Sequence, residues 1–164
     1  GNSASPITNK IGYIKSNEPI LTTTDLSDGV LLEISFSYLG DFFDLYPSRI
    51  VVGLVTSEKT INDSVIDLGV QTTTNSFLTS TPDNISNGKR LDGHPLRDVL
   101  RNFKLIISIK NGVVVLFCSE LNYITTVLYT NKNPLFIKLG MLDAISGRNK
   151  GTLVYNGITS KIKM

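Results

Sequence analysis

Two runs rich in valine, isoleucine, leucine and phenylalanine, Phe103–Lys110 and Val113–Cys118, are separated only by Asn111 and Gly112. Asparagine and glycine tolerate the positive φ angles that both central residues of a type I′ turn require, so this pattern predicts a β-hairpin. A two-residue turn also sets the register of the two strands. The residues that lie opposite each other are then Lys110 and Val113, Ile109 and Val114, and Ile107 and Leu116.

This register gives the hairpin one apolar face and one mixed face, because successive side chains of a strand point to opposite sides. The apolar face, which must belong to the core, contains Phe103, Leu105, Ile107, Ile109, Val114, Leu116 and Cys118. The mixed face is too apolar for ordinary solvated surface, although it also carries Lys104, Ser108 and Lys110. We expect it to be an interaction face covered by the chain itself, a second copy or a ligand, through Ile106, Val113, Val115 and Phe117.

The composition indicates one globular domain over residues 1–164, of which residues 1–10 form an extended lead-in. Hydrophobic residues make up 41% and charged residues 18%, and the 13 glycines suit an all-β protein with many turns. The net charge of +2 is scattered, which predicts no nucleic-acid partner. No apolar run approaches the ~20 residues of a membrane span, so we expect no membrane insertion. The lone cysteine, Cys118, excludes an internal disulfide.

Alternating and β-branched segments predict ten or eleven strands. Val30–Tyr38 alternates cleanly, and Gly53 inside Ile50–Thr56 indicates a bulge or a close approach of two backbones. Further short strands are expected at Pro19–Thr23 and on both sides of the pair Asn156-Gly157, whereas Thr81–Gly93 looks rich in turns. The expected core residues are Leu32, Ile34, Phe36, Val52, Leu54, Leu105, Ile107, Ile109, Val114, Leu116, Ile137 and Leu139.

One short helix is expected at Pro95–Arg101, where proline stands in the first turn and apolar residues follow at helical spacing.

Residues for catalysis are scarce. His94 is the one histidine, and no nucleophile motif accompanies it. Glu33 has no second carboxylate nearby on the same strand face, which a glycosidase would need. We therefore predict that the chain is not an enzyme. The cluster of Asp83, Asn84, Asn87 and Asp92 has oxygen ligands for Ca²⁺, but turn formation explains these residues well enough, and we predict no metal and no cofactor.

Aromatic residues in the predicted loops fit a binding site better. Phe42, Phe43 and Tyr46 lie close together in one loop and could stack on a sugar ring or fill the pocket of a partner. Alternatively, one or two of them close the end of the core. Polar and aromatic residues near other predicted loop ends complete a candidate ligand site, which comprises Phe42, Phe43, Tyr46, His94, Asn122 and Tyr123.

Three passages resemble the concanavalin A-like β-sandwich, the jelly roll of legume lectins, laminin-G modules, SPRY domains and carbohydrate-binding modules. They are Val30–Thr56, with paired strands; Phe103–Phe117, with the hairpin; and Pro134–Tyr155, with PLFIKLG and GTLVY. The resemblance implies a two-layer antiparallel jelly roll. The metal-binding acidic strand of legume lectins and the acid pair of glycosidases have no counterpart here.

Two functions remain open. The first is non-catalytic glycan recognition, in an adhesion or receptor-binding domain of a virion, phage tail or secreted protein. Its partner would be a glycan or glycoprotein receptor, and its location extracellular or on a particle surface, with a cytoplasmic location left open. The second is a protein-interaction or assembly domain, in which the hairpin's mixed face buries against a partner or a copy of itself.

Overall fold

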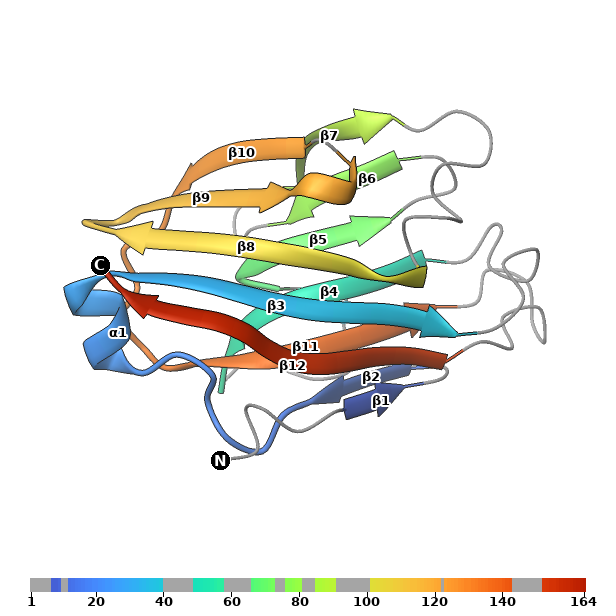
Figure 1. The fold of residues 1–164 in the computed structure, drawn as a ribbon, viewed down its shortest axis with the longest axis horizontal. Helices are drawn as coiled ribbons and strands as arrows, with labels where there is room; N and C mark the ends of the chain where they lie inside the picture. The colour runs from blue at the N-terminus through green and yellow to red at the C-terminus, as the bar shows by residue number, and fades with distance from the viewer. Residues whose placement is uncertain are drawn as a thin grey trace.

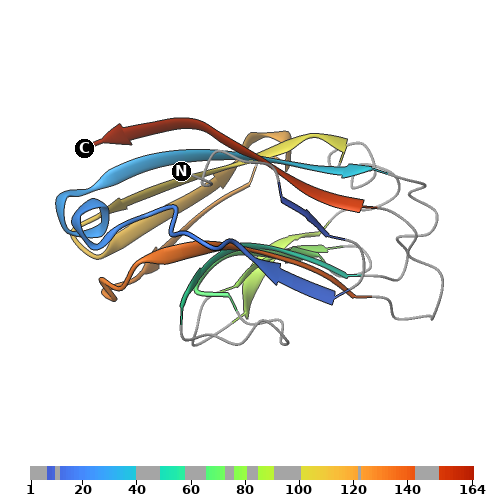
Figure 2. The same ribbon diagram turned by 90° about the horizontal axis from the view of Figure 1, so that it is seen from below.

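In the computed structural model the chain forms two antiparallel six-stranded sheets stacked as two layers (Figures 1 and 2). The structure describes residues 7–9, 12–39, 49–57, 66–72, 76–80, 85–90, 101–121, 123–142 and 152–164. Each layer has one face on the shared core, and this arrangement confirms the predicted all-β sandwich. Within these ranges no helix is long and apolar enough to cross a membrane.

The first sheet contains the predicted hairpin and ends at the strand that follows it. Its order is β1-β12-β3-β8-β9-β10. The strands are β1 (Ile7–Asn9), β12 (Thr152–Lys163), β3 (Val30–Leu39), β8 (Phe103–Lys110), β9 (Val113–Cys118) and β10 (Tyr123–Leu128). A short 3₁₀ turn, η3 (Ser119–Leu121), connects β9 with β10.

The second sheet is assembled from segments that are distant in the sequence. Its order is β2-β11-β4-β5-β6-β7. The strands are β2 (Gly12–Lys15), β11 (Leu135–Leu142), β4 (Arg49–Thr56), β5 (Leu68–Thr72), β6 (Ser76–Ser80) and β7 (Ile85–Arg90).

The hairpin has the predicted turn and register. Asn111 has a φ of 52° and Gly112 a φ of 76°, so both central residues adopt the positive angles of the turn. Ile107 lies opposite Leu116 and Lys110 opposite Val113. Burial alternates along both strands, and the side chains predicted to face the core are the buried ones.

All twelve residues expected in the core are buried, each at most 1% exposed. At the centre, the ring of Phe36 stacks on Phe103 with a centroid distance of 5.4 Å and packs against Tyr155 at 5.6 Å. Burial raises the pKa of the Tyr155 hydroxyl above its ordinary value. The two sheets therefore share an aromatic and aliphatic core built from period-two alternation.

Helix α1 (Thr23–Asp28) was not predicted, and the strand expected at Pro19–Thr23 is wrong. Thr22 caps the helix: the backbone N–H of Asp25 donates to its hydroxyl at 3.1 Å, and its own N–H donates to the Asp25 carboxylate at 2.8 Å. This capping box and the burial of Leu26 stabilise a helix too short to show periodicity. Of the helix predicted at Pro95–Arg101, only Arg101 is described, and it is helical.

Two further expectations need correction. Residues 85–90, expected in a turn-rich segment, form β7 beside β6. The segment around Asn156-Gly157 does not separate two strands but forms an irregularity inside the single strand β12, where Gly157 has a φ of 117°. The Asn156 amide donates to the Ser37 hydroxyl at 2.8 Å, which anchors this bulge to β3.

Candidate functional site

The solvent-facing surface of the first sheet carries the candidate site. Because opposite residues of antiparallel strands point to the same side, the register aligns side chains in rows across β3, β8, β9 and β10. One row is Glu33, Ile106, Phe117 and Ile124; the next is Leu31, Ser108, Val115 and Thr126; the third is Lys110, Val113 and Leu128. We call the apolar members on the last three strands the apolar face: Ile106, Val113, Val115, Phe117, Ile124 and Leu128.

The apolar face is open to solvent, most strongly on β10. Leu128 is 82% exposed, Ile124 64% and Val113 40%. Ile106, Val115 and Phe117 are partly buried by their neighbours in the rows. Large aliphatic side chains that are exposed together in adjacent strands are typical of a contact surface rather than of ordinary solvated surface.

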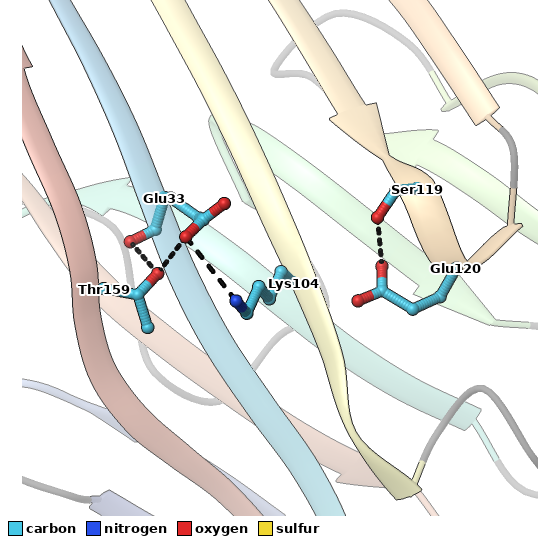
Figure 3. A network of polar contacts seen from close by, with 5 residues as sticks. All are labelled: Glu33, Lys104, Ser119, Glu120 and Thr159. Atoms are coloured by element: carbon cyan, nitrogen blue, oxygen red, sulfur yellow. Dashed lines mark hydrogen bonds and ion pairs between the residues drawn. The ribbon is translucent and has the colours of Figure 1, made fainter.

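A polar network borders the apolar face on the side of β12 (Figure 3). The Thr159 hydroxyl donates to the Glu33 carboxylate, and the Lys104 ammonium lies 3.7 Å from the same carboxylate. The side chains of Lys104 and Glu33 are 45% and 27% exposed, so this ion pair contributes little to stability. At the end of β9, the Ser119 hydroxyl donates to the Glu120 carboxylate at 3.1 Å. The surface is therefore an apolar centre with a hydrogen-bonded, charged border.

The outer face of the second sheet is different, because several of its described side chains are buried. Val51, Val55 and Ile66 form a cluster with no exposed surface, against which Phe136 packs. Lys138 is fully buried, with its ammonium 5.1 Å from the centroid of the Tyr13 ring. This face offers less open apolar surface than the first sheet.

Most residues of the predicted ligand site lie outside the described residues: Phe42, Phe43, Tyr46, His94 and Asn122. Tyr123 begins β10 opposite Cys118, is 9% exposed and belongs to the core cluster. Its role in ligand binding stays a prediction.

Ile106, Val113, Val115 and Phe117, the predicted interaction face, lie together on one side of the sheet. Ile124 and Leu128, the most exposed members of the apolar face, were not predicted from the sequence. The alternation of Ile124, Thr126 and Leu128 was visible, but only the pairing of β10 with β9 aligns these residues with Phe117 and Val113.

The described residues hold no cluster of three or more histidine, cysteine, aspartate or glutamate side chains that would bind a metal. Cys118 is buried, forms no disulfide and donates to the Glu120 carboxylate, with its sulfur 3.7 Å from Oε2.

No protein-family model and no curated protein sequence matches the chain. Solved structures do match its fold. The TRIM65 PSpry domain has 10% sequence identity and a TM-score of 0.56, over 89% of this chain and 70% of that one. Alginate lyase AlyC3, in complex with dimannuronate, has 10% identity and a TM-score of 0.55, over 97% and 74%. Sheep galectin-11 matches over 96% of this chain and 97% of its own, with 10% identity and a TM-score of 0.49.

Two family 7 alginate lyase structures also match, and the chain spans only 66% and 62% of their lengths. The prediction that the chain is not an enzyme is corrected by these comparisons, because structures that share its fold include AlyC3, an enzyme. The absence of hydrolase arrangements from the sequence does not exclude catalysis on this fold. The fold itself is as expected: the chain has the fold of a concanavalin A-like β-sandwich.

Proposed function

We propose that this chain is a protein-interaction module whose contact surface is the apolar face. The observation that carries the proposal is the exposure of Leu128 and Ile124, at 82% and 64%, beside Val113 and Phe117. When a protein partner removes aliphatic side chains from water, binding is favoured by about 25 cal/mol for each Å² of apolar surface that is buried.

The same surface is a poor match for a sugar. Aliphatic groups neither donate nor accept hydrogen bonds, and the aromatic ring of the face, Phe117, is partly buried. Glycan recognition relies on residues that lie outside the described ranges, apart from the buried Tyr123. The fold alone does not choose between the two functions, since β-sandwiches serve both.

Selection of binders from a displayed library of random peptides tests the proposal, because contact surfaces capture such peptides preferentially. The recovered peptides are then measured against two variants of the apolar face, Leu128→Asp and Ile124→Asp. We expect binding to weaken by about tenfold or more, since a carboxylate in an apolar contact loses its hydration. The matched control is Asn17→Asp, which places the same charge at an exposed residue just after β2 of the second sheet, away from the apolar face.

Peptides that bind both face variants and the control equally well would contradict the proposal. Failure to recover any binder would count against it as well. Circular dichroism of each variant checks that the fold is retained, which we expect because Ile124 and Leu128 are exposed.

A further inference from the structure

In the described part of the fold β10 is an edge strand, and its own sequence lacks the residues that usually protect an edge. Among the described residues it pairs with β9 alone. Its sequence, Tyr-Ile-Thr-Thr-Val-Leu, contains no charge, no glycine and no proline and is rich in residues that favour strands. Natural sheets protect exposed edges with charges, prolines, bulges or very short strands, because a free edge is a template for pairing with another chain.

The other edges in the described part of the fold are shorter or carry such protection. β1 has three residues, and β2 has four and ends at Lys15. β7 ends in Gly88, Lys89 and Arg90 and pairs with β6 in an irregular register. The six uncharged residues of β10 are therefore distinct from the remaining edges.

We propose that β10 pairs antiparallel with β10 of a second copy around a two-fold axis, so that Thr126 lies opposite Thr126. This contact uses the edge of β10 and leaves the apolar face open, so it goes beyond the proposed function. A symmetric contact must be self-complementary. In this register Ile124 of each copy lies opposite Leu128 of the other on the outer face, and Thr125 lies opposite Val127 on the inner face.

The two neighbouring symmetric registers are less favourable. Side chains that lie opposite each other must point to the same side of the sheet, so every symmetric register has one residue on the axis, and the neighbours of Thr126 are Thr125 and Val127. With Thr125 on the axis, Ile124 would lie opposite Thr126 and Leu128 would extend beyond the strand of the other copy. With Val127 on the axis, Leu128 would lie opposite Thr126 and Ile124 would extend beyond that strand. The register centred on Thr126 is the one that pairs the two most exposed apolar residues with each other.

The lysines near the end of β10 lie toward α1 rather than toward the strand edge. Lys132, after the strand, donates to the Leu26 carbonyl at 3.1 Å, and the side chain of Lys110 lies beside Gly29. The pairing joins the two first sheets into one continuous sheet and makes the two apolar faces one surface.

Sedimentation velocity over a concentration series, on the full chain, tests this pairing. We expect the wild type to dimerise. Thr126→Lys alone and Thr126→Glu alone should each weaken dimerisation by about tenfold or more, because like charges then lie opposite each other on the axis. An equimolar mixture of the two variants should form a heterodimer. The control Ile162→Lys adds a charge at a 53% exposed residue on β12, away from β10, and should leave the dimer intact.

Each other outcome overturns the inference in a distinguishable way. A wild type that dimerises, with both Thr126 variants unaffected and Leu128→Asp disrupted, would indicate face-to-face packing: the proposed contact surface would stand and the edge pairing would fall. A wild type that stays monomeric at every concentration would overturn the edge pairing, while the peptide selection would decide the proposed function separately. Monomeric Thr126 variants that fail to form a heterodimer would overturn the register.

Discussion

Gly53 of β4 and Gly69 of β5 lie directly opposite each other, and a Cβ atom added at Gly53 would lie 2.8 Å from the Cα atom of Gly69. The same Cβ would also approach the Leu68 carbonyl oxygen, and the side chain of Ile66 lies above the pair. The close backbone approach that the sequence indicated at Gly53 is thereby confirmed. Because neither glycine carries a side chain, the buried side chain of Ile66 can lie directly on the sheet.

We expect Gly53→Ala to lower the free energy of unfolding by about 1–3 kcal/mol, because the atoms that the methyl group meets belong mainly to the backbone and cannot turn away. Urea denaturation measures this loss. Ser35→Ala is the matched control, since it creates the same residue on the outer face of β3 and should cost less than about 1 kcal/mol. Equal losses in the two variants would contradict the interpretation of Gly53.

Gly112→Ala should destabilise the hairpin by about 1 kcal/mol, because alanine at a positive φ is strained. Gly112 has a φ of 76°, and the added Cβ would lie 3.3 Å from Cγ2 of Thr130. Asn111→Gly serves as the comparison: glycine adopts the φ of 52° at that position without strain, so the loss should be smaller. Thermal unfolding of both variants provides the measurement, and the reverse order of stability would refute the assigned turn.

Truncation of Phe36 should have a large effect, about 3–5 kcal/mol, because its fully buried ring packs between Phe103 and Tyr155. Phe36→Ala removes these contacts and leaves a cavity in the centre of the core. Ile162→Ala, at a 53% exposed residue, should change the unfolding free energy by at most about 0.5 kcal/mol. A loss below about 1 kcal/mol for Phe36→Ala would show that the core is not organised around this ring.

Asp25 couples the cap of α1 to the last strand. Its Oδ2 accepts from the Thr22 N–H and lies 2.9 Å from the Lys161 ammonium, which also donates to the Ile20 carbonyl at 3.1 Å. Burial by itself would raise the pKa of Asp25, but the hydrogen bonds from Thr22 and Lys161 outweigh it and hold the pKa below the ordinary 3.8. The charged carboxylate is therefore the form that stabilises the fold.

The pKa of Asp25 is lower in the folded chain than in the unfolded one. Its contribution to the free energy of unfolding is therefore present above pH 3.8 and is lost as the pH falls below that value. Asp25→Asn should remove this pH dependence. Thr22→Ala should cost about 1 kcal/mol through the lost cap. Lys163→Met is the control for the charge network, because the pair of Lys163 with Asp28 is largely exposed. Urea denaturation of the three variants at several acidic pH values measures these effects. If Asp25→Asn still lost stability at acidic pH as the wild type does, the pH dependence would belong to other carboxylates.

The predictable parts of the fold are those that local chemistry specifies. The turn at Asn111-Gly112 and the alternation of β3, β8 and β9 can be read from neighbouring residues, and they suffice to assign the core faces. Segments whose structure depends on partners outside the segment itself were assigned wrongly. β7 has a turn-like sequence but pairs with β6, and the irregularity at Gly157 is held by a hydrogen bond from Asn156 to Ser37.

By itself, the sequence determined the hairpin, its register, the twelve core residues and four members of the apolar face, because side chains alternate with period two and a two-residue turn leaves no freedom of register. Only the tertiary structure decided the order of the strands, which places β10 at the end of a sheet and aligns Ile124 and Leu128 with Phe117 and Val113. Strand order depends on pairing between distant segments and on the stacking of two sheets, and no local pattern encodes either. The exposed edge, and with it the proposed contact between copies, follows from that order.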